Sequence, residues 1–134
     1  MGGGASVVHN ARSVVVVGGG YAGVAFVSRI VRQKWLRRFK RIVLVDRRDS
    51  LHHCVAACRA VVVPRWDGKL FLPYASLVAH AEKQAPGVLQ FMHGTATSVS
   101  DGRVDVVSVA GELQHVDFGT QARRQPSVLC ELLW

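Results

Sequence analysis

The chain has 134 residues, of which 49% are hydrophobic and 19% are charged, and its formal net charge is +8. This length predicts one domain, and the composition excludes an intrinsically disordered chain. No apolar run approaches the roughly 18 residues that a membrane span requires, and no secretory signal is evident. The three cysteines form no even, disulfide-rich framework, which favours a reducing, cytoplasmic compartment.

Residues 1–12 form a Gly-rich leader that we expect to be flexible. The run Met1-Gly2-Gly3-Gly4-Ala5-Ser6 fits the N-myristoylation pattern and makes Gly2 the acceptor of the lipid. One myristoyl chain binds membranes only marginally, so stable association needs a second signal. The alternative is a Gly-rich leader that matches this short pattern by chance.

A strand over Ser13–Val17 is expected next, and it leads into Gly18-Gly19-Gly20-Tyr21-Ala22-Gly23. A helix over Tyr21–Arg38 follows, and a second apolar strand over Arg41–Val45 ends on Asp46. A strand, a G-x-G-x-x-G turn, a helix and a second strand with a terminal acid form the dinucleotide-binding fingerprint. The alternative is a glycine-rich turn that only connects a strand to a helix.

Each part of this fingerprint has a physical role. Gly18 allows the tight turn, Gly20 lets the backbone approach a pyrophosphate, and Gly23 lets the helix pack closely on the strand. The N-terminus of the helix presents N–H groups to the phosphates. Asp46 lies 23 residues beyond Gly23, close to the roughly 20-residue spacing of the acid that binds a ribose hydroxyl.

The predicted helix has an apolar stripe, and a strongly basic stretch starts on the helix and continues beyond it. We expect the stripe to be buried, and it consists of Ala22, Ala25, Phe26, Ile30 and Val31. The basic stretch is a solvated surface, a surface for anionic membranes, or a surface for nucleic acid. No nucleic-acid partner is expected, because no zinc-finger spacing or helix-turn-helix pattern is present. Its members are Arg29, Arg32, Lys34, Arg37, Arg38, Lys40, Arg41, Arg47 and Arg48.

The rest of the chain predicts a mixture of short helices and strands. A polar turn over Asp46–Ser50 precedes a helix that starts at Val55–Ala60. The β-branched run Val61–Val63 and Pro64 are expected to end this helix. An extended piece over Leu70–Tyr74 and a helix over Tyr74–Gln84 follow. Four strands complete the unit, with hairpin turns at Asp101-Gly102 and Ala110-Gly111: Val88–Met92, Thr95–Val99, Arg103–Val109 and Glu112–Phe118.

The glycine loop, the strand that ends in Asp46, and the run Asp49-Ser50-Leu51-His52-His53-Cys54-Val55-Ala56-Ala57-Cys58-Arg59-Ala60 carry a resemblance. They resemble the start of the ferroptosis suppressor proteins, which are apoptosis-inducing factor-like, FAD-dependent oxidoreductases. The type II NADH dehydrogenases are more distant relatives in the same pyridine nucleotide-disulfide oxidoreductase superfamily. The resemblance covers Val14 to Phe118, and the His-His segment is more specific than the glycine loop.

The resemblance implies that FAD takes hydride from NAD(P)H and passes electrons to a quinone. It implies contacts of the FAD phosphates with residues 18–22, and of the FAD ribose with Asp46. It further implies that Arg59 reaches the cofactor and that the backbone of Ala96 meets the adenine. Cys54 departs from the family, which tends to carry asparagine there. No residue is expected to act as a catalytic acid or base.

The family members are much longer than this chain. They carry a second glycine motif for NAD(P)H, and an Ala-Thr-Gly strand that closes the flavin domain. Here Val116-Asp117-Phe118 resembles the approach to that strand, but residues 119–134 diverge from the family. A truncated or frameshifted gene product, or a genuine short variant, would explain this tail.

The cysteines and histidines after the second strand allow three interpretations. A redox disulfide between Cys54 and Cys58 would resemble that of flavin disulfide reductases, although their pair has four intervening residues and this one has three. A zinc site would add His52 and His53. We favour cysteines that are small apolar residues in a packed segment, and histidines that are hydrogen-bonded beside the cofactor, with no metal.

These observations predict an α/β fold, a Rossmann-like FAD-binding unit with a parallel sheet and an appended β-hairpin region, incomplete relative to the family. The unit covers residues 13–118. The expected function is the FAD-binding portion of an NAD(P)H:quinone-type oxidoreductase. The alternatives are a non-catalytic nucleotide-binding remnant and an NADP-binding domain, since Arg47 and Arg48 follow Asp46 and an arginine there can bind a 2′-phosphate. The expected partners are FAD and an anionic membrane surface, with peripheral binding through Gly2.

Overall fold

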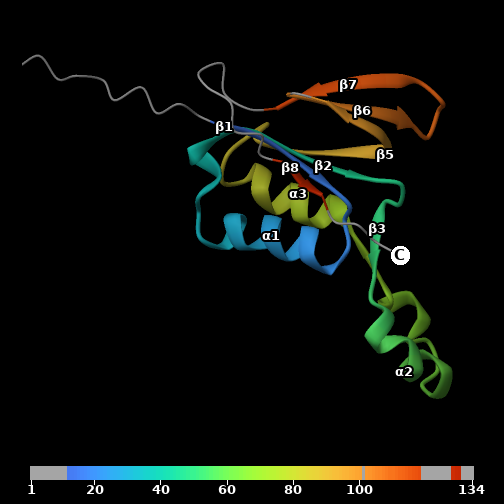
Figure 1. The fold of residues 1–134 in the computed structure, drawn as a ribbon. Coiled ribbons are helices and arrows are strands. Elements are labelled where there is room, and N and C mark those ends of the chain that lie inside the picture. Colours follow the sequence, from blue (N-terminus) through green and yellow to red (C-terminus); the bar gives the residue numbers. More distant parts are fainter. Residues whose placement is uncertain (1–11, 101, 119–127, 131–134) are drawn as a thin grey trace, which may run out of the picture.

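The computed structural model describes residues 12–100, 102–118 and 128–130 (Figure 1). Its centre is a set of parallel strands formed by β1 (Arg12–Val17), β2 (Phe39–Asp46) and the first half of β5 (Leu89–Ser100). The continuous valine and isoleucine runs form these strands because both faces of the sheet are covered. The α/β fold that the sequence predicts is therefore confirmed.

Six strands form the main sheet, in the order β7-β6-β5-β2-β1-β8. The strands β6 (Arg103–Ser108) and β7 (Leu113–Asp117) continue from β5 as an antiparallel meander, which is the predicted β-hairpin region. The short strand β8 (Val128–Cys130) pairs in parallel with β1. This pairing carries the sheet past position 118, where we predict that the domain ends.

The helices α1 (Tyr21–Arg32) and α3 (Tyr74–Glu82) cover one face of the parallel strands. On this face Val14, Val16, Ile42 and Leu44 pack into one core with the buried residues of both helices. Within α1 the buried residues are Gly23, Val27, Ile30 and Val31. The predicted stripe is correct at Ile30 and Val31 but wrong at Ala22 and Ala25, which are exposed. The helical period that starts at Gly23 selects Val27 instead.

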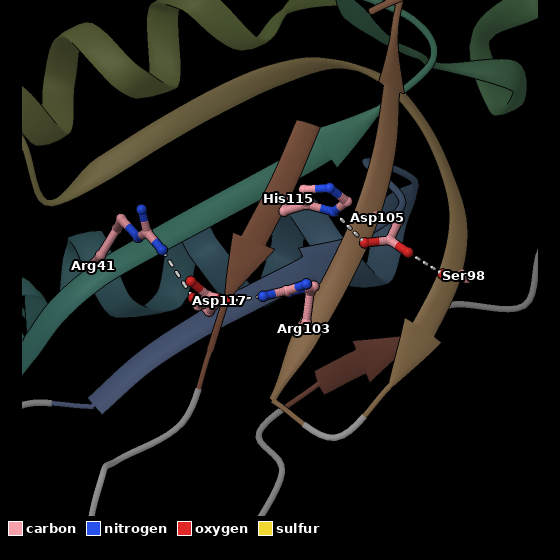
Figure 2. Close-up of polar contacts among 6 residues, drawn as sticks. All are labelled: Arg41, Ser98, Arg103, Asp105, His115 and Asp117. Atoms are coloured by element: carbon pink, nitrogen blue, oxygen red, sulfur yellow. Dashed lines mark hydrogen bonds and ion pairs between the residues drawn. The ribbon is translucent and has the colours of Figure 1, made fainter. Parts of the chain in front are cut away.

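The antiparallel meander covers the opposite face. Val104, Val106, Val116 and Phe118 pack against Val15, Val43 and Val45 to form a second core. The outer side of the meander carries a polar cluster (Figure 2), in which the Asp105 carboxylate accepts a hydrogen bond from Ser98 Oγ at 2.6 Å and lies 2.6 Å from His115 Nδ1. These two contacts lower the pKa of Asp105 below its ordinary value of 3.8, and the Ser98 hydrogen bond is the larger cause.

Strand β5 is continuous where we predict two strands, Val88–Met92 and Thr95–Val99. Gly94 lies at the transition, where pairing changes from β2 on one side to β6 on the other. A Cβ atom at Gly94 would lie 2.5 Å from the Val107 carbonyl oxygen. Glycine therefore marks a close approach of two strands here, and it does not interrupt the strand.

Helix α1 ends at Arg32, six residues before the predicted end at Arg38. Lys34 has a φ of 56°, and the N–H groups of Lys34 and Trp35 donate to the carbonyls of Val31 and Ile30. This is the Schellman arrangement, which normally has glycine at the left-handed position. A lysine occupies that position here, so the composition gave no stop signal. The short 3₁₀ turn η1 (Leu36–Arg38) then leads into β2.

Residues 50–73 form an arm that projects from the main body (Figure 1). It starts with β3 (Ser50–His52) and returns through the antiparallel strand β4 (Phe71–Pro73). Between them lie η2 (Cys54–Ala56), α2 (Ala57–Val62) and η3 (Asp67–Lys69), and none of these three has a buried residue. The predicted packed environment of Cys54 and Cys58 is therefore wrong, because the arm projects away from both cores.

Helix α2 includes Val61 and Val62 and ends at Val63, which is extended, with Pro64 after it. The predicted stop at Val61–Val63 and Pro64 is confirmed, although the helix continues through the first two valines of the run. The residue before a proline disfavours the helical conformation, and this sets the end. The extended piece before Tyr74 and the helix after it are confirmed as β4 and α3. None of the helices in the described ranges has the length and apolar character that a bilayer span demands.

Candidate functional site

An open cavity of about 610 Å³ lies at the carboxyl ends of β1 and β2. In open α/β sheets this is the edge at which ligands bind, and the volume falls in the range of small-molecule sites. The glycine loop forms one wall, and β5 beyond His93, where its pairing with β2 stops, forms another. The lining residues are Val17, Gly18, Gly19, Gly20, Tyr21, Val45, Asp46, Arg47, Arg48, Ser50, Leu51, His52, Cys54, Tyr74, Gly94, Thr95 and Ala96.

Two hydrogen bonds from backbone N–H groups hold the glycine loop against the end of β2. Gly18 has a φ of 99°, a conformation that favours glycine, and its N–H donates to the Val45 carbonyl at 2.8 Å. The Gly19 N–H donates to Asp46 Oδ2 at 2.5 Å. Asp46 therefore fixes the loop directly, a role that its position in the sequence does not reveal.

The second carboxylate oxygen of Asp46 is also engaged, because Oδ1 accepts a hydrogen bond from the Arg48 N–H at 2.7 Å. Each carboxylate oxygen has a further lone pair. The side chain can therefore keep both internal hydrogen bonds and still accept one from a ribose hydroxyl. Gly20 stands at the N-cap of α1, and the first turn of that helix contains no acidic residue. The first turn of α1 therefore places no carboxylate of its own at the positive end of the helix dipole.

Tyr74 is a site residue that our sequence analysis did not identify. It is 3% exposed, lies at the start of α3 and donates a hydrogen bond from its hydroxyl to the Gly19 carbonyl at 2.7 Å. A Cβ atom at Gly19 would overlap the hydroxyl and ring of Tyr74. Only glycine fits here, but no local sequence pattern indicates it, because the two residues are 55 positions apart.

Tyr21 connects the start of α1 to the arm. Its hydroxyl oxygen lies 2.9 Å from His53 Nδ1 and 3.6 Å from Cys54 Sγ, and it accepts a hydrogen bond from the Val55 N–H at 3.5 Å. The hydrogen bond with the thiol is the main cause that raises the pKa of Tyr21. His52 lines the cavity and stacks on Phe71, with 5.2 Å between ring centroids. The two adjacent histidines therefore have different partners.

The structure brings most of the predicted cofactor residues to this cavity. Gly18, Gly19, Gly20, Tyr21, Asp46 and Ala96 all line it. Ala22 and Gly23 follow in the first turn of α1, outside the lining. Ala96 reaches the cavity from β5, opposite Val106 of β6.

Arg59, like Ala22 and Gly23, is not among the residues that line the cavity. It lies on α2 in the arm, and its guanidinium carbon is 5.1 Å from the centre of the Trp66 ring. Gly2, the predicted lipidation site, and the run 119–127 lie outside the described residues. Their predicted roles stay predictions.

The nine basic residues of the predicted cluster do not form one surface. Arg47 and Arg48 line the cavity, whereas the others lie near the start of β2 and the end of α1. Five residues of β2, 42–46, separate Arg41 from Arg47, which corresponds to about 20 Å of extended chain between the two arginines. The structure therefore assigns the basic residues to two different ends of the sheet.

The side chains that could bind zinc do not converge in the described part of the chain. Cys54 and Cys58 are free and exposed. No group of three or more His, Cys, Asp or Glu side chains in the described ranges could hold a metal ion.

The chain has clear relatives among characterised proteins. Ferroptosis suppressor protein 1 of Taeniopygia guttata is 37% identical over 102 residues, which cover 76% of this chain and 24% of that protein. The human protein of the same name is 40% identical over 75 residues, which cover 56% of this chain and 19% of the relative. The predicted resemblance is confirmed.

Apoptosis-inducing factor homolog B of Dictyostelium discoideum is a further relative, 28% identical over 89 residues, which cover 66% of this chain and 19% of that protein. The chain spans a quarter or less of the length of these relatives. No protein-family profile matches the chain.

Solved structures share the fold. NDH2 from Plasmodium falciparum in complex with NADH superposes with a TM-score of 0.61 at 11% identity, over 80% of this chain and 20% of that one. Reduced CoADR-RHD of Bacillus anthracis gives a TM-score of 0.58 at 18% identity, over 81% of this chain and 19% of that one. At these identities the likeness concerns the fold alone, and it agrees with the Rossmann-like unit that the sequence predicts.

Proposed function

We propose that this chain is the FAD-binding portion of an NAD(P)H:quinone-type oxidoreductase. The observation that carries the proposal is the cavity at the carboxyl ends of β1 and β2, where the glycine loop meets Asp46. A helix N-terminus without acidic residues suits a pyrophosphate, and a carboxylate with spare lone pairs suits a ribose. The similarity to the ferroptosis suppressor proteins supports the same choice.

The residues present fit the adenosine and pyrophosphate half of FAD. The loop 18–20 would hold the phosphates, Asp46 would accept from the ribose, and Ala96 would lie beside the adenine on the free edge of β5. A bound flavin supplies the hydride and electron transfer of such enzymes. The residues of this chain bind and orient the cofactor, and none of them is assigned a proton transfer.

Calorimetric titration tests the cofactor assignment. FAD is expected to bind, and ADP is expected to compete with it, because ADP carries the groups that the cavity fits. Gly20→Val is expected to abolish both interactions, since a side chain there would occupy the space of the pyrophosphate. FAD binding that ADP does not displace would contradict this placement.

A second candidate is an NADP site, and it is favoured by Arg47 and Arg48, which line the cavity beside Asp46. An arginine at this position can bind a 2′-phosphate, although the charge of Asp46 would repel it. Comparison of FAD with NADP in the same titration separates an FAD site from an NADP site. Tighter binding of NADP than of FAD would reverse the assignment. Loss of that preference in Arg48→Gln would then show that Arg48 binds the 2′-phosphate.

The 134-residue chain alone is not expected to catalyse quinone reduction. It spans a quarter or less of its relatives, and our proposal assigns it no nicotinamide site. An assay with NADH, a soluble quinone and added FAD tests this. Turnover that Gly20→Val abolishes would show that these residues suffice. A non-catalytic nucleotide-binding remnant would bind FAD equally well. To exclude a remnant, the part of a longer relative that this chain lacks is added to the chain as a separate protein. Turnover that requires both proteins would show that the chain is not a non-catalytic remnant.

We also propose that the protein is peripheral on membranes, through myristoylation of Gly2. The support is the match of residues 1–6 to the acylation pattern. Expression in cells that contain the acyltransferase, followed by fractionation, tests it. Gly2→Ala is expected to move the protein to the soluble fraction.

A further inference from the structure

Six basic side chains gather at the end of the parallel sheet where β1 and β2 begin. We call them the basic end: Arg29, Arg32, Lys34, Arg37, Arg38 and Lys40. They come from the last turn of α1, the turn that follows it, η1 and the start of β2, and all six are exposed. No acidic residue occurs between Tyr21 and Val45, so the basic end contains no internal counter-charge.

The ion pairs of the described residues do not include the basic end. Within the described ranges the ion pairs are Arg103 with Asp117, and His115 with Asp105, and all four residues belong to the meander (Figure 2). Glu82, at the end of α3, accepts a hydrogen bond from the Gly87 N–H at 2.9 Å. None of the six side chains forms an ion pair among these residues, and their charge is therefore available to an external partner.

Arg41 differs from the basic end because its side chain has a partner within the fold. It follows the basic end by one residue, but its guanidinium donates to the Asp117 carbonyl at 2.8 Å and faces the meander (Figure 2). This arginine has an internal structural role. The six residues of the basic end have no comparable contact in the described structure.

The helix dipole explains only part of this arrangement. Cations in the last turn of a helix are stabilised by its negative end, which accounts for Arg29 and Arg32. The effect falls off within one turn, whereas Arg37, Arg38 and Lys40 lie beyond the end of α1. Helix stability therefore does not account for half of the basic end.

An aromatic side chain lies within the basic end. Trp35 is 39% exposed, and the guanidinium carbon of Arg38 lies 5.5 Å from the centre of its ring. The Schellman turn at Lys34 fixes the backbone that presents it. Tryptophan flanked by cations is typical of a lipid–water interface, where the ring sits at the level of the headgroups.

The first described residue, Arg12, lies at the same end of the sheet. Arg12, the first residue of β1, pairs with Phe39, which directly follows η1. The chain that precedes Arg12 therefore joins the sheet beside the basic end.

We propose that the basic end docks onto an anionic lipid surface. This inference deepens the proposed membrane association by naming the surface that makes contact, and it does not depend on acylation of Gly2. The cavity lies at the other end of β2. Docking in this orientation directs the mouth of the cavity away from the lipid.

Sedimentation with vesicles tests the proposal, with bacterially expressed protein that carries no acyl group. The protein is expected to bind vesicles of phosphatidylcholine with phosphatidylserine, to bind phosphatidylcholine alone much more weakly, and to dissociate as salt is raised. Each cation near an anionic surface contributes about fivefold in affinity. The double variant Arg37→Gln, Arg38→Gln is therefore expected to bind about 25-fold more weakly.

The double variant Arg47→Gln, Arg48→Gln is the matched control. It removes the same net charge from the cavity end and is expected to bind vesicles as the unmodified protein does. Equal losses in the two double variants would overturn the proposal, because only net charge would then matter. Tighter binding to duplex DNA than to anionic vesicles, lost in the Arg37 and Arg38 variant, would also overturn it and assign the basic end to nucleic acid.

Because acylation is absent from this assay, a failure of the Gly2 proposal leaves its result unchanged. FAD affinity of the Arg37 and Arg38 variant is expected to equal that of the unmodified chain, which keeps the surface and the cofactor site distinguishable. Circular dichroism confirms that each variant is folded, and both pairs of arginines are exposed.

Discussion

The two ends of the parallel sheet are built in opposite ways. At the cavity end, backbone groups and one carboxylate satisfy one another, so that Gly19 bonds to both Asp46 and Tyr74. At the basic end, six charged side chains are exposed and form no ion pair in the described structure, and Arg38 lies over the ring of Trp35. Substitutions at the first end therefore act through the fold, whereas substitutions at the second act only on what the protein binds.

The strongest test of this difference is Gly19→Ala. The new methyl group would overlap Tyr74, which is buried and packs its ring 5.1 Å from that of Phe91. Overpacking of this kind costs about 3 kcal/mol in the free energy of unfolding, which urea denaturation measures. Gly68→Ala is the control, because nothing lies within 4 Å of a Cβ there. Equal stability of both variants would show that the loop is not tightly packed.

Asp46→Ala comes next. It removes the acceptor of the buried Gly19 N–H and of the Arg48 N–H. A buried donor without a partner costs about 2 kcal/mol, and FAD affinity should fall as well because the ribose loses its acceptor. Asp46→Asn retains one acceptor oxygen and should recover part of the stability. Asp67→Ala, an exposed acid in the arm, is the control and should leave the unfolding midpoint unchanged.

Tyr74→Phe removes one buried hydrogen bond, the 2.7 Å contact with the Gly19 carbonyl. The expected loss is about 1 kcal/mol, the usual value for such a bond. Tyr21→Phe removes a hydroxyl that is exposed, and we expect less than about 0.5 kcal/mol. If both variants lose the same stability, the buried hydrogen bond of Tyr74 stabilises the fold no more than the exposed hydroxyl of Tyr21 does.

At the basic end, Arg37→Gln with Arg38→Gln should change the free energy of unfolding by less than about 0.5 kcal/mol. A small increase in the unfolding midpoint at low salt is the expected direction, because like charges repel one another there. Thermal denaturation at low and high salt measures this. A clear loss of stability would mean that these arginines have internal partners, and the contrast between the two ends would fail.

The meander supplies the smallest effect. The pKa of Asp105 is lowered by the hydrogen bond from Ser98 and by His115. Since the folded pKa lies below the unfolded one, this carboxylate contributes stability above about pH 4, and the contribution is lost as pH falls through the folded pKa. Asp105→Asn should therefore flatten the acid side of the stability profile, measured by urea denaturation. An unchanged slope on the acid side would show that Asp105 does not contribute to the pH dependence of stability.

The cavity end could be predicted because its signals are local. The glycine spacing, the valine run before it and the acid after the second strand each lie within a short window, and the structure places Gly18, Gly20 and Asp46 at one cavity. The tertiary partners were not predictable in this way. Tyr74 reaches Gly19 from a helix 55 residues further along the chain, without any pattern that links the two.

The errors also have physical causes. Lys34 adopts a left-handed conformation that glycine normally takes, so the end of α1 gave no signal. Gly94 lies inside β5 because two strands approach closely, whereas isolated glycines usually suggest a break. The arm exposes Val55, Val61 and Val62, whose apolar character predicts burial. Composition records how apolar a segment is, but not whether anything covers it.

The partner of β1 has a consequence for the order of folding. The meander joins strands that are neighbours in sequence, and its pairs can form as soon as those residues are available. The pairing of Val15 with Val128 closes a loop of more than a hundred residues, and the entropy of that closure delays it. On a ribosome, β1 emerges first and acquires β8 last, so one edge of the central sheet stays open throughout synthesis.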